Sequence, residues 1–160
     1  MNHRLTSLKS AKTFISFLLF LHGFGVVMVT CLFIIGLFYQ GSLHIDSDFT
    51  IYLRHPGPLG YWGSILILMK YYILLAILYF VRQFFQNILT ERIFVEQNVE
   101  LAKRTAVLLV IASFLGEGIF TLYEFSFFNV PFIVTALAVW ALAKVLEEAN
   151  RIAKEQEFTI

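Results

Sequence analysis

The sequence has few charged residues, a single cysteine and three prolines. Charged residues make up 14% of the 160 residues and hydrophobic residues 59%, whereas ordinary soluble domains have roughly 25% and 45 to 50%. This shortage of charge argues against a soluble domain and predicts an integral membrane protein that contacts the lipid bilayer. The single cysteine, Cys31, excludes an internal disulfide.

Signatures of common catalytic and nucleotide-binding sites are missing as well. The sequence has no His-Glu-x-x-His segment, no glycine-rich phosphate loop and no nucleophile elbow. Its basic residues are interleaved with acids, which does not favour direct nucleic-acid binding. We therefore expect a protein that is not an enzyme, uses no cofactor and binds no nucleic acid directly.

Four apolar segments are long enough for a helix that crosses a bilayer, which needs about 20 residues. They lie at about 13–39, 61–85, 105–123 and 130–146. The first contains no charge and is too long for the hydrophobic part of a signal peptide. The sequence thus predicts an all-α, four-transmembrane-helix bundle that forms a single domain of residues 1–160.

Basic residues gather on one side of these segments. Those before the first span, between the second and third, and after the fourth are Arg4, Lys9, Lys12, Arg92, Lys103, Arg104, Arg151 and Lys154, whereas the opposite side offers Arg54. The positive-inside rule then places both termini and the inner segment 89–104 in the cytoplasm, with the loop 40–60 outside.

Two of the connecting segments have patterns of their own. The alternation from Leu43 to Leu53 predicts one or two short strands in the outer loop. From Val95 onward, the inner segment predicts a helix that runs into the third span, with an ion pair between Glu100 and Arg104 at i, i+4.

The helical pattern continues beyond the fourth span, over 147–160. We expect a cytoplasmic amphipathic helix in which Arg151 pairs with both Glu147 and Glu155. Its apolar face is the predicted docking element for a partner. That face consists of Val145, Ala149, Ile152 and Ala153, followed by Phe158.

Lys70 and Glu117 are charges inside apolar segments, where each costs roughly 2.5 to 3.5 kcal/mol on insertion scales. Both lie about 18 to 20 Å from the inner surface, on spans that we expect to be antiparallel neighbours. One interpretation is an ion pair that fixes helix register. The alternatives are an unpaired arrangement, with Lys70 reaching outward and Glu117 protonated, or a working ion or proton site.

Glu117 belongs to a predicted polar stripe. Ser113, Glu117, Thr121 and Glu124 recur at spacings of 4, 4 and 3, which in a helix places them on one inward face. His22 lies near the middle of the first span and would join Glu117 in a proton relay. The alternative is a hydrogen-bonded histidine between helices.

The outer loop contains a weaker constellation. His44, Asp46 and Asp48 alternate and His55 follows, a set of side chains that can ligate a metal ion such as Zn²⁺. A solvated polar loop explains the same residues, and we expect no metal.

Two runs of residues resemble a known family. They are Phe94 and Glu96-Gln-Asn-Val99 followed by Lys103-Arg104, and the ending from Leu142 to Ile160. They are similar to the bacterial membrane family catalogued as domain of unknown function 2975, with its Phe-x-x-x-Asn-Val segment before the third span. Members usually carry Gly, Pro and a small hydroxyl residue around that Phe, where this chain has Glu91, Ile93 and Val95.

The resemblance implies four spans in the bacterial plasma membrane, with no established activity. Members are often encoded beside a small helix-turn-helix regulator, which suggests a partner or a signalling circuit. Our first hypothesis is accordingly a non-enzymatic regulatory, sensory or self-protection protein that contacts another membrane or cytoplasmic protein. The second is a small oligomeric transporter or channel component that uses the polar interior around Glu117.

Small residues that allow close helix approach, within one chain or in a homo-oligomer, are Gly23, Gly25, Gly36, Gly116 and Gly118.

Overall fold

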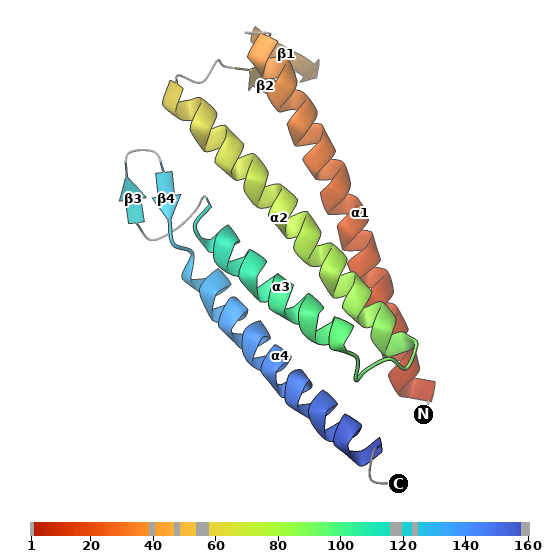
Figure 1. Ribbon diagram of the computed structural model, residues 1–160. Helices are drawn as coiled ribbons and strands as arrows, with labels where there is room; N and C mark the ends of the chain where they lie inside the picture. The colour runs from red at the N-terminus through yellow and green to blue at the C-terminus, as the bar shows by residue number, and fades with distance from the viewer. Residues whose placement is uncertain are drawn as a thin grey trace.

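The computed structural model describes the backbone of residues 2–38, 41–46, 49–53, 58–115, 120–122 and 125–157, and the side chains of 6, 8–38, 62–115 and 128–156. Within these residues the chain forms four helices and two hairpins (Figure 1). The helices are α1 (Asn2–Phe38), α2 (Pro58–Leu89), α3 (Glu96–Ser113) and α4 (Val130–Glu157). The strands are β1 (Gly41–Asp46), β2 (Phe49–Leu53), β3 (Phe120–Leu122) and β4 (Phe125–Phe127).

Three of the helices are long and apolar enough to cross a membrane. Their apolar stretches are Leu8–Phe38 in α1, Trp62–Leu89 in α2 and Val130–Gln156 in α4. Large apolar side chains on all three are exposed, and few described residues are fully buried. Exposed apolar surface on this scale is unfavourable in water, so the three helices are those of a membrane protein in contact with lipid.

The prediction that the third span is one continuous helix is wrong. α3 ends at Ser113, and Phe120–Leu122 form strand β3. The nine or so helical residues that remain of the predicted span cover only about 14 Å, less than half of a bilayer core of about 30 Å. The local sequence explains the ending, because Gly116 and Gly118 are poor helix formers and Phe120, Phe125 and Phe127 favour strands.

Both hairpins lie at the end of the molecule opposite the termini (Figure 1). β1 pairs with β2 antiparallel, from Gly41 opposite Leu53 to His44 opposite Thr50, with an irregularity before Asp46. The predicted short strands in the outer loop are therefore confirmed. β3 pairs with β4 in the same way, with Thr121 opposite Ser126, and this second hairpin reverses the chain between α3 and α4.

The helices contact one another in chain order: α1 packs on α2, α2 on α3, and α3 on α4. The small core lies between α2, α3 and α4, around Ile77, Leu109 and Ala136.

α1 is joined to α2 by polar contacts at several levels. Lys12 Nζ donates to Gln86 Oε1, Arg82 Nε donates to Ser16 Oγ at 3.0 Å, and the Thr30 and Tyr72 hydroxyls lie 3.1 Å apart.

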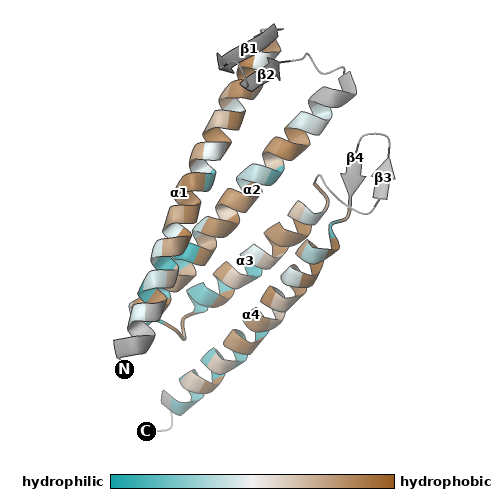
Figure 2. Cartoon of the chain, turned by 180° about the vertical axis from the view of Figure 1, so that it is seen from behind, coloured by the Kyte–Doolittle hydropathy of each residue, from teal (hydrophilic) through white to brown (hydrophobic). Residues whose placement is uncertain are grey.

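Polar residues concentrate at the end where both termini lie. Figure 2 shows hydrophilic residues gathered toward that end of the helices, whereas hydrophobic residues predominate along the rest of α1 and α2. The first and last described residues, Asn2 and Glu157, lie at this end as well (Figure 1). Among the described side chains, polar residues therefore gather at this end, called here the terminal end.

The turn between α2 and α3 is built at the terminal end without a side-chain helix cap. Arg92 N donates to Asn87 O at 2.9 Å and Glu91 N to Ile88 O at 3.1 Å, the bond pair of a Schellman motif. Glu91 has φ 62°, a left-handed conformation that glycine adopts more easily. At the start of α3, Val95 makes no side-chain cap bond.

Candidate functional site

Lys70 and His22, two members of the predicted polar interior, face different neighbours of α2. His22 Nε2 lies 3.0 Å from the carbonyl oxygen of Tyr71, and since a carbonyl can only accept, the proton is on Nε2. Lys70, the residue before Tyr71 on α2, instead places Nζ over the Phe132 ring of α4, 5.5 Å from its centroid. His22 thus joins α1 to α2, whereas Lys70 reaches from α2 to α4, and the two side chains have different partners.

Ser113, at the end of α3, is buried, and its hydroxyl donates to Val110 O at 2.6 Å within its own helix. Its carbonyl accepts a hydrogen bond from Asn129 N at 2.8 Å, which ties the end of α3 to the start of α4. The predicted helical stripe is interrupted here, because Thr121 lies in strand β3. Glu117 and Glu124 lie outside the described residues, so the Lys70–Glu117 pair stays a prediction.

The candidate metal ligands of the outer loop are divided in the same way. Asp48 and His55 lie outside the described residues, and the strand irregularity between His44 and Asp46 disturbs the alternation on which the hypothesis depended. Among the side chains that the structure describes, no three His, Cys, Asp or Glu residues gather to hold a metal ion.

Asn98, at the terminal end, is a buried polar side chain with 1% of its surface exposed. Its Nδ2 donates to the carbonyl oxygens of Arg92 and Ile93 at 2.8 and 2.9 Å, and its Oδ1 accepts from Asn87 Nδ2 at 2.8 Å. One amide thereby satisfies two loop carbonyls and links α2 to α3. The Asn-Val pair of the family-like segment is thus a structural lock on this turn, since Val99 is buried too.

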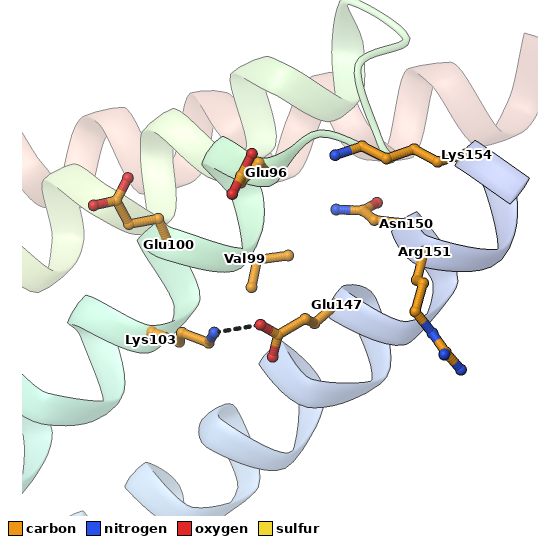
Figure 3. A pocket seen from close by; sticks show the side chains of 8 residues that line it. All are labelled: Glu96, Val99, Glu100, Lys103, Glu147, Asn150, Arg151 and Lys154. Atoms are coloured by element: carbon orange, nitrogen blue, oxygen red, sulfur yellow. Dashed lines mark hydrogen bonds and ion pairs between the residues drawn. The ribbon is translucent and has the colours of Figure 1, made fainter.

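A charged cleft of about 490 Å³ opens between α3 and α4 at the terminal end. Figure 3 shows the eight side chains that line it: Glu96, Val99, Glu100 and Lys103 from α3, and Glu147, Asn150, Arg151 and Lys154 from α4. Both sets follow the spacing i, i+3, i+4, i+7, which defines one helix face. The spacing is visible in the sequence, but the sequence does not show that the two faces lie opposite each other, so it does not predict the cleft.

Ion pairs hold the walls of this cleft. Lys103 Nζ lies 2.8 Å from Glu147 Oε1 across the two helices, and Lys144 Nζ lies 2.9 Å from Glu147 Oε2. The predicted Glu100–Arg104 pair is confirmed, and Arg151 lies 4.0 Å from Glu155 as predicted. The predicted Glu147–Arg151 pair is wrong: Arg151 binds Glu148, because Glu147 is bound by Lys103 of α3 and by Lys144 of its own helix.

The predicted docking face of α4 points away from this cleft. α4 is one continuous helix to Glu157, as the sequence predicts. Val145 and Ile152 are 66% and 47% exposed, and Ala149 and Ala153 are half-buried. Phe158 lies outside the described residues.

Comparisons with known proteins add no assignment, since no family model, no curated protein and no solved structure matches the chain. The resemblance to the family of unknown function therefore stays a prediction, and the candidate sites stand on their geometry.

Proposed function

We propose that this chain is a non-enzymatic bacterial plasma-membrane protein, with both termini in the cytoplasm, that binds another protein through the end of α4. The observation that carries the proposal is the continuation of α4 past Leu146 to Glu157 with Val145 and Ile152 exposed on one face. An apolar strip on a helix that extends from a membrane span is suited to a partner helix.

The described polar groups favour this function over transport. A permeation path needs polar side chains that converge on one route. His22 contacts α2 from the α1 side, Lys70 contacts α4, and the Ser113 hydroxyl is used within α3. The small oligomeric transporter around Glu117 is the second candidate, and Glu117 is tested in the Discussion.

The test is affinity purification of the full-length protein in mild detergent, with mass spectrometry and a photo-crosslinking residue at position 152. We expect a stoichiometric partner that crosslinks at 152 and is lost in Val145→Ser/Ile152→Ser. The matched control is Ile93→Ser/Phe94→Ser, which removes two exposed apolar side chains at the same end but outside α4. Purification without a partner, or equal loss in both double variants, would contradict the proposal.

A further inference from the structure

The α3–α4 cleft has two oppositely charged walls. The Lys103–Glu147 pair joins the two helices and neutralises itself, with its members 2.8 Å apart. Glu100 is paired with Arg104, and Arg151 is paired with Glu148. The lining charges that form no ion pair with a described residue are therefore Glu96 on the α3 wall and Lys154 on the α4 wall (Figure 3). The lining thus has three carboxylates and three cations, of which one acid on α3 and one base on α4 are unpaired.

This arrangement selects the charge type of a ligand. A simple anion drawn to Lys154 would meet the Glu96 carboxylate, and a simple cation drawn to Glu96 would meet Lys154. A zwitterion that spans the cleft satisfies both walls, with its cation at α3 and its anion at α4.

Three groups in the cleft lack partners that a ligand would supply. Glu96 and Lys154 form no ion pair with any described residue, and Asn150 Oδ1 is shielded from solvent yet accepts no hydrogen bond. Turning the Asn150 amide toward the opening brings this oxygen to a ligand's N–H group. Carboxylate and amide oxygens both accept from N–H, so a primary ammonium suits them better than a quaternary one, which has no N–H.

The surface on the membrane side of the cleft is apolar. Val107, Val110 and Ile111 continue the cleft-lining face of α3 by helical spacing, and Trp140 does the same on α4, seven residues before Glu147. All four are exposed. Lys144 Nζ lies 5.9 Å from the Trp140 ring centroid, a lysine and tryptophan combination typical of the membrane interface. A hydrocarbon chain leaving the cleft would lie along this strip.

We propose that the cleft binds the phosphoethanolamine head group of a membrane phospholipid. Its primary ammonium lies against Glu96 and Asn150, its phosphate against Lys154, and its acyl chains along Val107, Ile111 and Trp140. The site is on the face of α4 opposite Val145 and Ile152, so it stands independently of the proposed docking function.

The test is native mass spectrometry of the delipidated full-length protein, in detergent containing equal amounts of phosphatidylethanolamine, phosphatidylcholine and phosphatidylglycerol with identical chains. We expect one bound lipid, with phosphatidylethanolamine retained about tenfold more than either competitor, the effect of one charge-assisted hydrogen bond. Soluble phosphoethanolamine serves as a competitor without acyl chains, and we expect it to displace the lipid only at far higher concentration.

Variants place the lipid in the cleft. Glu96→Gln and Lys154→Gln are each expected to lower phosphatidylethanolamine retention about tenfold. Glu91→Gln and Lys9→Gln remove the same charges from exposed positions at the same end outside the cleft, and retention should stay unchanged. Circular dichroism and gel filtration confirm that each variant is folded.

Several outcomes would overturn the proposal. Equal retention of the three lipids would remove the zwitterion argument, and unchanged retention in both Glu96→Gln and Lys154→Gln would place the lipid elsewhere. Binding of soluble phosphoethanolamine as tight as that of the diacyl lipid would show a soluble ligand rather than a membrane one.

Discussion

At the residue scale, one amide and one strained backbone position determine how the chain turns between α2 and α3. Asn98 holds the carbonyls of Arg92 and Ile93, while Glu91 has a positive φ in the Schellman turn. The family-like segment drew attention to Asn98, but its bonds to Asn87 and to two loop carbonyls depend on how the turn folds. That information is not contained in the local sequence pattern.

Replacing Asn98 should test the lock directly. Asn98→Ala leaves two loop carbonyls and the Asn87 amide without their partner, so we expect a loss of about 2 to 4 kcal/mol of unfolding free energy. Thermal unfolding in detergent measures this loss. Gln97→Ala, at the exposed neighbouring position, should cost less than about 0.5 kcal/mol, and an equal loss in both variants would contradict the assignment.

Replacing Glu91 should have the opposite effect. Glu91→Gly relieves a left-handed conformation that costs a non-glycine residue about 1 to 2 kcal/mol, partly offset by the greater freedom of glycine in the unfolded chain. We expect a gain of up to about 1 kcal/mol in the same unfolding assay. Glu91→Ala keeps the strain and removes the same carboxylate, so a matching gain in Glu91→Ala would show that charge is responsible.

Lys70 offers a test of the predicted ion pair with Glu117. If the pair exists, Lys70→Met leaves a buried carboxylate uncompensated and should lower the unfolding free energy by about 3 to 5 kcal/mol, and adding Glu117→Gln should restore most of it. A single Lys70→Met variant as stable as the wild type would contradict the pair and leave the Phe132 contact as the role of Lys70. If the protein is instead a transporter, Glu117→Gln should abolish ion or proton uptake while the protein level stays unchanged.

At the scale of elements, small residues allow α3 and α4 to pack closely. Ala112 and Ala143 are fully buried, and Ala106 and Ala136 are 3% and 2% exposed. The Lys103–Glu147 pair is 38% and 46% exposed in its side chains, so it contributes at most about 1 kcal/mol. Alanine packing therefore holds these two helices together more than charge does.

Enlarging one of these alanines should separate the two helices. Ala143→Leu inserts three carbon atoms into a filled interface, and we expect a loss of about 1 to 3 kcal/mol together with faster proteolysis of the α4 end. Ala141→Leu, at an exposed position on the same helix, makes the same change without the clash and should leave stability and proteolysis unchanged. Similar behaviour of the two variants would contradict the assigned interface.

At the scale of the whole molecule, α1, α2 and α4 are the apolar helices and α3 with its hairpin returns the chain. This return makes α4 antiparallel to α3 and brings both ends of the described chain to one polar end (Figure 1). The topology predicted from basic residues has the same arrangement of the two ends and places this end in the cytoplasm.

Reporter fusions in a bacterial host should determine that orientation. We expect green fluorescent protein joined after Ile160 to fluoresce and alkaline phosphatase joined there to be inactive, because the positive-inside rule places this end in the cytoplasm. Alkaline phosphatase inserted after Gly57, in the outer loop, should be active. The reverse pattern would contradict the orientation.

The sequence by itself determined the membrane character, the three long apolar helices, the continuous α4 and the first hairpin. Each of these depends on composition or on a local period, and local patterns are sufficient for them. It did not determine where α3 ends, because a run of apolar residues reads alike as a buried helix or as strands. Only the tertiary structure decided that His22 and Lys70 face different helices, and that the charged faces of α3 and α4 meet in one cleft. Those facts depend on helix rotation and on pairing between distant segments, which no local pattern contains.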